Sequence, residues 1–149
     1  MPGSPLDRPH HDGGSLHVGN DAPGLGETVP VFLRVPRGDG CTGAWVRTTP
    51  DAEPRLAAGV VDRETDAETW WRFDVTVRNP LTGYRFLLGG GRGGSRWLNG
   101  TGVHGHDVPD GADFRLSAAA PPPAWARDAV VYQIFPDRFA RSASPTTTA

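Results

Sequence analysis

The sequence contains little of what several classes of protein need. Its one cysteine, Cys41, excludes an intramolecular disulfide framework. No apolar run reaches the roughly 18 residues of a membrane-spanning helix, so no membrane partner is expected. Only 21% of the residues are charged and the net charge is −2, which argues against nucleic acid as a partner. The first residues lack the charged and apolar regions of a secretory signal, and this predicts a cytoplasmic location.

Glycine and proline are plentiful instead, with 20 and 15 of the 149 residues. They recur too often for a helical bundle, because each lowers helix stability. Residues 1–14 combine them with histidine and aspartate (MPGSPLDRPHHDGG) and are expected to form a disordered leader. The rest of the composition favours a turn-rich β domain.

Several short segments alternate between apolar and polar residues, which is the pattern of half-buried strands. In residues 70–77, Trp71, Phe73 and Val75 share one face, and Trp70 lies on the other. Further strands are expected over residues 16–19, 28–35, 44–49, 55–61, 84–88, 96–99 and 114–116. Turn signals roughly every 8–12 residues separate them. This spacing predicts an all-β fold, an immunoglobulin-like antiparallel β-sandwich, over residues 15–118.

The pattern changes after residue 118. Residues 119–125 include three consecutive prolines and are expected to form an extended linker. The segment AVVYQIF, residues 129–135, is apolar on both faces, as in a buried parallel strand. Residues 126–149 are too few to complete a parallel sheet. They are therefore interpreted as the truncated start of a second domain.

These segments carry a family resemblance. The stretch AVVYQIFPDRF resembles the opening strand of the catalytic (β/α)8 barrel in the alpha-amylase family, glycoside hydrolase family 13. The stretches WWRFDVTV, YRFLL and WLNGTG resemble the N-terminal domain of neopullulanases and cyclomaltodextrinases, carbohydrate-binding module family 34. The residues of the barrel-start motif are Tyr132, Gln133, Phe135, Pro136, Asp137, Arg138 and Phe139.

The resemblance implies retaining hydrolysis of α-glucans such as starch, maltodextrin, pullulan or cyclodextrin. The family's catalytic carboxylates lie on later barrel strands that this sequence does not contain. Beyond the linker, only Asp128 and Asp137 are acidic, and they flank the expected strand. They are thus too far apart for the roughly 5–5.5 Å that a retaining pair needs. The sequence therefore predicts an inactive N-terminal fragment whose missing partner is the catalytic barrel, and no catalytic residue is assigned.

Metal ions are not expected either. Many relatives carry a calcium loop rich in Asn and Asp after the barrel-start motif, but residues 140–149 contain neither residue, so no cofactor is assigned. His104 and His106 alternate like two ligands on one strand face. Asp107, Asp110 and Asp113 could offer oxygen ligands, but their spacing fits turns equally well.

Three tryptophans are the candidate site residues: Trp70, Trp45 and Trp97. An outward-facing Trp70 could stack on a sugar ring or form an interface with the barrel or with a second subunit in a homodimer. The phases of Trp45 and Trp97 are ambiguous, and core packing is the expectation for both. Besides an inactive enzyme fragment, a stand-alone α-glucan-binding module and a structural or dimerisation domain without sugar binding remain open.

Overall fold

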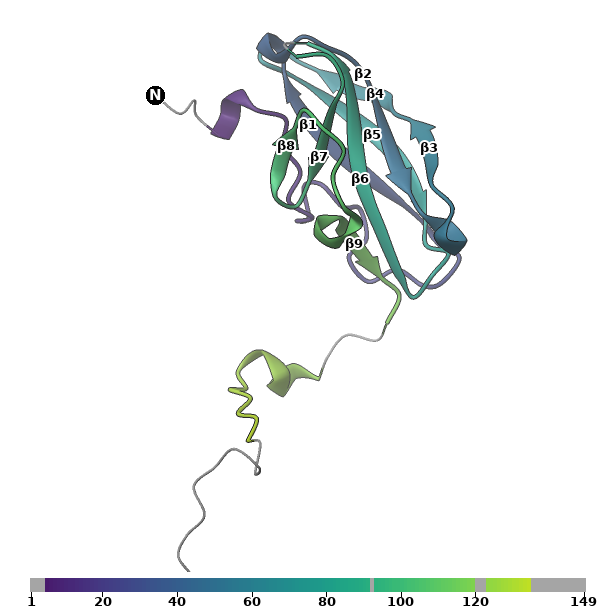
Figure 1. The fold of residues 1–149 in the computed structure, drawn as a ribbon. Helices are drawn as coiled ribbons and strands as arrows, with labels where there is room; N and C mark the ends of the chain where they lie inside the picture. Colours follow the sequence, from purple (N-terminus) through teal and green to yellow (C-terminus); the bar gives the residue numbers. More distant parts are fainter. Residues whose placement is uncertain (1–4, 92, 120–122, 135–149) are drawn as a thin grey trace, which may run out of the picture.

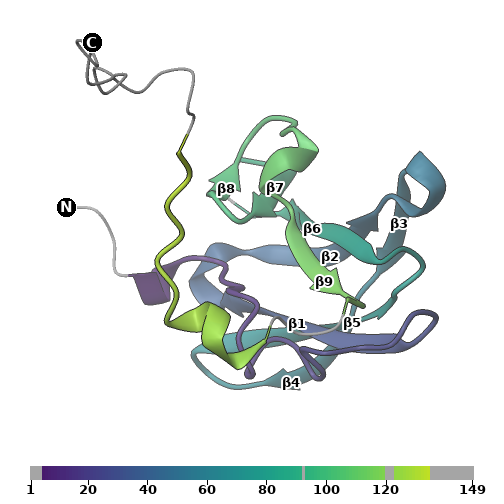
Figure 2. The same cartoon turned by 90° about the horizontal axis from the view of Figure 1, so that it is seen from below.

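The computed structural model describes residues 5–91, 93–119 and 123–134. These residues form nine strands in two antiparallel sheets that pack face to face (Figures 1 and 2). The predicted all-β sandwich is confirmed. The helices are single 3₁₀ turns at Pro5–Asp7, Arg37–Asp39, Pro50–Ala52, Asp110–Ala112 and Ala124–Arg127. None of the helices in the described ranges has the length and apolar character to span a bilayer.

The smaller sheet has three strands in the order β1-β5-β4. Their bounds are Thr28–Pro36 for β1, Glu68–Thr76 for β5 and Val60–Glu64 for β4. The strand β1 lies antiparallel to β5 along its whole length, from Thr28 opposite Thr76 to Pro36 opposite Glu68.

The larger sheet has six strands, and five of them follow the order β3-β2-β6-β7-β8. The bounds of these five are Arg55–Ala58, Cys41–Thr48, Leu81–Gly90, Arg96–Asn99 and Gly102–His104. The sixth strand, β9 (Phe114–Ser117), pairs with the first half of β6. The sequence predicts a strand at each of these positions except β8, whose three residues are too short to show a period.

The core fills the space between the sheets, as the alternating pattern predicts. From β1, Val29, Val31 and Leu33 are fully buried and face the buried side chains of the larger sheet. Full burial of such a side chain contributes about 1.5–3 kcal/mol. The other buried members of the core are Val18, Val35, Ala44, Val46, Phe73, Val75, Val77, Tyr84, Phe86, Leu88, Leu98 and Leu116.

Gly59 moves the chain from one sheet to the other. The single strand expected over residues 55–61 is wrong, because β3 belongs to the larger sheet and β4 to the smaller one. The Gly59 amide donates to the carbonyl of Ala44 at 2.8 Å. A Cβ atom at Gly59 would lie 2.4 Å from the ring of Phe73. Only glycine lets the backbone pass this close to a buried ring.

The N-terminal segment, residues 5–19, packs along β1 (purple in Figure 2). The expected disordered leader over residues 1–14 is therefore wrong wherever the structure describes it. His10 and Arg34 exchange two backbone hydrogen bonds, at 2.8 and 3.1 Å. The short strand expected over residues 16–19 is reduced to one isolated bridge.

His11 joins the N-terminal segment to both sheets and is 5% exposed. Its Nδ1 donates to the carbonyl of Phe32 at 2.8 Å, so its Nε2 accepts from the hydroxyl of Tyr84 at 2.8 Å. Its ring also meets those of Phe86 and Phe114 edge to face. Burial lowers the pKa of His11 to about 4, and the nearby His17 lowers it further while the Phe32 carbonyl opposes the shift.

The segment after the sandwich does not form the expected strand. Residues 129–134 have no regular secondary structure and extend away from the sandwich (Figure 1). A strand needs a neighbour to pair with, and none lies beside this segment in the described part of the chain. The last residue of the expected strand, Phe135, lies outside the described residues.

Gly59→Ala should destabilise the sandwich by about 1–3 kcal/mol, because the methyl group would overlap the ring of Phe73. Urea unfolding followed by tryptophan fluorescence measures the difference. Gly105→Ala is the matched control, since a Cβ there meets nothing within 4 Å and its φ is not positive. Equal stabilities of the two variants would contradict the close approach.

Stability should fall as the pH is lowered from 6.5 to 4, because the unfolded chain protonates His11 in this range and the folded chain does not. The pKa of His11 falls from its ordinary value of 6.5 to about 4 in the folded chain, and this difference corresponds to about 3 kcal/mol. The free energy of unfolding measured in urea at several pH values checks this. His11→Gln keeps a donor for Phe32 and does not titrate, so its pH dependence should be flatter; an unchanged slope would refute the assignment.

Candidate functional site

Trp70 lies on the outer face of the smaller sheet, as its phase predicts, but it is covered. It is 6% exposed, so the expectation of an exposed ring is wrong. The ring of His17 stacks on it at 5.1 Å, and the guanidinium of Arg63 lies 4.2 Å from its centre. Its Nε1 donates to a carboxylate oxygen of Glu68 at 2.7 Å. Trp70 therefore anchors the N-terminal segment and offers no face to a ligand.

The other two candidate tryptophans lie together on the outer face of the larger sheet. Trp45 on β2 is opposite Leu87 on β6, and Leu87 is opposite Trp97 on β7. All three side chains are partly exposed, so core packing, the expectation for both tryptophans, is wrong. Two strand spacings separate the tryptophans, about 10 Å. We call Trp45, Leu87 and Trp97 the aromatic row.

At one end of the aromatic row, two glycines leave room for the ring of Trp45. A Cβ atom at Gly43 or at Gly89 would lie 2.9 or 3.0 Å from the ring of Trp45. The indole therefore lies over bare backbone, and larger residues at these positions would push it outward. Gly43 lies two residues before Trp45 on β2, and Gly89 lies opposite Gly43 on β6. Such a pair of glycines is a sequence signal for an indole lying over backbone, but only once the pairing of β2 with β6 is known.

A buried cation holds the other end. Arg85 is 2% exposed and lies 5.1 Å from the centre of the Trp97 ring. It donates to the carbonyl of Val108 and, at 2.7 Å, to the carboxylate of Asp110. An oxygen of Asp113 lies 3.4 Å from the Arg85 guanidinium. Burial raises the pKa of Asp113, although the charge of Arg85 acts in the opposite direction. The loop between β8 and β9 is thus fastened beside Trp97.

A hollow of about 400 Å³ adjoins the aromatic row. The hollow combines the indole of Trp97 with charged side chains that can donate hydrogen bonds to hydroxyl groups or accept them. Arg47 at its rim donates to Asp110 at 3.0 Å, which orients the guanidinium. Its lining residues are Arg47, Pro54, Leu56, Arg85, Trp97 and Asp107.

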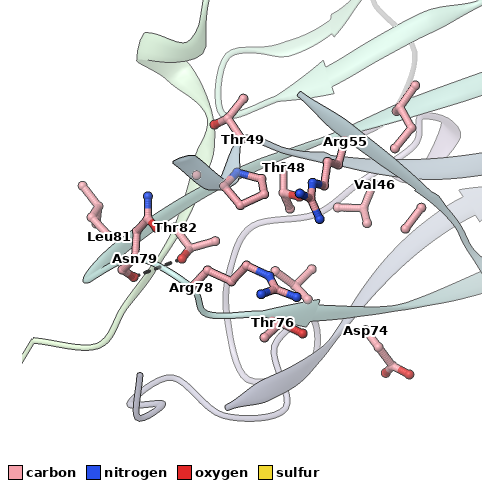
Figure 3. A pocket seen from close by; sticks show the side chains of 15 residues that line it. Val46, Thr48, Thr49, Arg55, Asp74, Thr76, Arg78, Asn79, Leu81 and Thr82 are labelled. Atoms are coloured by element: carbon pink, nitrogen blue, oxygen red, sulfur yellow. Dashed lines mark hydrogen bonds between the residues drawn. The ribbon is translucent and has the colours of Figure 1, made fainter. Parts of the chain in front are cut away.

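A second cavity, of about 290 Å³, opens at one end of the sandwich (Figure 3). Its labelled side chains are mainly polar and include Thr48, Thr76, Arg78 and Asn79. The hydroxyl of Thr82 donates to the carbonyl of Asn79 at 3.1 Å. None of the described residues that line this cavity is aromatic, so these residues do not offer the flat apolar surface on which a sugar ring stacks.

The barrel-start motif contributes to neither place. Tyr132 is 82% exposed and Gln133 is exposed, so neither side chain is part of the buried core. The other five members of the motif lie outside the described residues. They are Phe135, Pro136, Asp137, Arg138 and Phe139.

The two histidines that alternate like metal ligands in the sequence, His104 and His106, have hydrogen-bond partners within the protein. His104 Nε2 shares a hydrogen bond with the hydroxyl of Thr101 at 2.9 Å, and His106 Nδ1 donates to the carbonyl of Asp107 at 2.8 Å. In the described residues, the three groups that do bring metal-ligating atoms together are His10, Asp12 and His17. No sequence signal indicates this cluster, because the composition of residues 1–14 predicts disorder.

No family model matches the sequence. Among solved structures, a cyclomaltodextrinase matches 88% of this chain with a TM-score of 0.63 and 23% identity. The type III pullulan hydrolase from Thermococcus kodakarensis matches 69% of this chain with a TM-score of 0.45 and 13% identity. The chain spans 23% of that cyclomaltodextrinase and 15% of that hydrolase. The chain therefore has the fold of one part of a cyclomaltodextrinase, in agreement with the resemblance found in the sequence.

Proposed function

We propose that this chain is the non-catalytic β-sandwich part of an α-glucan-active glycosidase of the alpha-amylase family, and that it binds α-glucan on the aromatic row. The observation that carries the proposal is the placement of Trp45 and Trp97 on one exposed face. Sugar rings present apolar C–H faces that stack on indole rings. The fold shared with a cyclomaltodextrinase supports the choice of α-glucan among carbohydrates.

The surroundings of the row suit a polysaccharide chain. The two indoles are far enough apart to contact two different sugar rings. Arg47 and Asp107 border the adjoining hollow and supply a donor and an acceptor for sugar hydroxyls. Trp45 over its glycines and Trp97 beside Arg85 are held before any ligand arrives, which limits the entropy lost on binding.

We assign binding and not hydrolysis to these residues. Hydrolysis with retention needs one carboxylate free to attack and one acid free to donate. Beside the row, Asp110 is engaged by Arg47 and Arg85, and Asp113 is buried against Arg85. Neither side chain is available to a glycosidic bond.

Trp97→Ala should weaken α-glucan binding about tenfold or more, because it removes one stacking surface. Affinity electrophoresis in native gels containing soluble starch or pullulan measures this as a loss of retardation. Trp125→Ala is the control, since Trp125 is 68% exposed but lies beyond the sandwich. Circular dichroism verifies that both variants remain folded.

Two results would count against glucan binding on the row. The first is equal retardation of Trp97→Ala and the unsubstituted chain. The second is a complete lack of retardation of the unsubstituted chain at high polysaccharide concentration, which would favour a packing role.

That packing role is the second candidate, and one observation favours it. Val130, Val131, Tyr132 and Ile134 are 92%, 86%, 82% and 57% exposed. Apolar side chains this exposed and this close together are typical of a segment that packs against another domain or a second copy of the chain. In this role the segment would join a catalytic barrel.

Removal of all residues after Pro121 should lower aggregation and leave the melting temperature unchanged. The exposed apolar segment is an aggregation hazard. In the described residues, the last hydrogen bonds between the sandwich and the chain that follows are donated by the Ala118 amide to the Pro80 carbonyl and by the Ala119 amide to the Ser117 hydroxyl. Light scattering and thermal unfolding of the two chains provide the comparison. A sandwich that unfolds on truncation would show that the segment packs against it.

A further inference from the structure

Three potential ligands converge at the N-terminal segment. His10, Asp12 and His17 each offer one ligand atom, and these atoms all lie within 4.8 Å of one another. The Nε2 atom of His10 is 3.6 Å from one Asp12 oxygen, and the Nε2 atom of His17 is 4.0 Å from the other. We call this group the His10–Asp12–His17 cluster. It lies beside the smaller sheet, whereas the aromatic row lies on the larger one. The cluster is therefore independent of the proposed function.

His17 is held in the form that a metal ligand requires. Its Nδ1 donates to the carbonyl of Phe32 at 2.9 Å, which leaves a lone pair on Nε2. A backbone acceptor on the far nitrogen is the usual partner of a metal-binding histidine. The side chain is 4% exposed and stacks on Trp70, so its Nε2 is fixed in its aim toward Asp12.

Asp12 is also held in place. Its Oδ1 accepts a hydrogen bond from the Gly14 amide at 2.8 Å, which fixes the orientation of the carboxylate. Gly13 adopts a φ of +74° between the two residues, which glycine does without strain. The tight turn directs the carboxylate back toward the two imidazoles.

His11 is excluded from the cluster although it lies between two of its members. Both of its ring nitrogens already have partners, the carbonyl of Phe32 and the hydroxyl of Tyr84. The sequence therefore divides its adjacent histidines between two tasks. His11 is part of the core, and His10 stays at the surface.

We propose that the His10–Asp12–His17 cluster binds a Zn²⁺ ion, with a fourth position open to water. Two imidazoles and one carboxylate are a common zinc ligand set, whereas Ca²⁺ and Mg²⁺ prefer oxygen ligands alone. Tetrahedral zinc separates its ligand atoms by about 3.4 Å. The ligand atoms must therefore move closer together, which the exposed side chains of His10 and Asp12 can do by rotation while His17 stays fixed. The bound ion would fasten the N-terminal segment over Trp70.

Isothermal titration calorimetry of the full chain, without a polyhistidine tag, tests the site with ZnCl₂ alone. One Zn²⁺ should bind per chain, and His10→Ala and Asp12→Asn should each weaken its affinity about tenfold or more. Both changes spare the fold: His10 pairs with Arg34 through its backbone, and an asparagine at position 12 keeps an oxygen for the Gly14 amide. His17→Ala is avoided because His17 packs against Trp70.

The matched control is the double variant His104→Ala/His106→Ala, which removes the other adjacent imidazole pair of the chain. It should bind Zn²⁺ as the unsubstituted chain does. ¹⁵N NMR of the histidine rings adds a direct readout: Zn²⁺ should shift Nε2 of His17 while its Nδ1 stays protonated. Zinc binding that persists in His10→Ala and Asp12→Asn, that disappears in the control, or that is undetectable in the unsubstituted chain would overturn the proposal.

Discussion

The carbonyl oxygen of Phe32 is the acceptor on which the N-terminal half of the structure depends. It receives two imidazole N–H groups, from His11 at 2.8 Å and from His17 at 2.9 Å. These bonds fix the tautomer of both rings. The remaining nitrogen of His11 then accepts from Tyr84 in the opposite sheet, and that of His17 faces Asp12. A single backbone oxygen thus joins the N-terminal segment, both sheets and the cluster of potential metal ligands.

The same arrangement decides which outer face of the sandwich is free. Because His17 is held by Phe32, its ring covers Trp70, and the outer face of the smaller sheet is closed at that point. On the outer face of the larger sheet, the described residues leave Trp45 and Leu87 partly exposed. Partly exposed indole rings therefore lie on the larger sheet, at Trp45 and Trp97. The position of a histidine in the N-terminal segment accounts for this asymmetry.

The period-two alternation predicted most strands of the sandwich and their inward residues, because one buried face imposes that period on each strand. It correctly placed Trp70 and Phe73 on opposite faces of the same strand, but it could not show that a distant segment covers the ring of Trp70. Composition indicated disorder for residues 1–14, since few of them are apolar. Their order comes from His11, whose partners Phe32 and Tyr84 lie 21 and 73 positions away. The aromatic row could not be predicted for a related reason: only the register between β2, β6 and β7 places Trp45 and Trp97 on either side of Leu87.

Charge repulsion explains why one end of the aromatic row is bounded and the rest is open. Arg47 and Arg85 lie directly opposite each other on β2 and β6, and two like charges in such a pair destabilise a sheet. Asp110 accepts hydrogen bonds from both and so offsets the repulsion. To reach them, the loop between β8 and β9 must fold back over the larger sheet. This loop buries Arg85 beside Trp97 but leaves Trp45 and Leu87 partly exposed, so the need to neutralise two arginines sets how much of the aromatic row stays exposed.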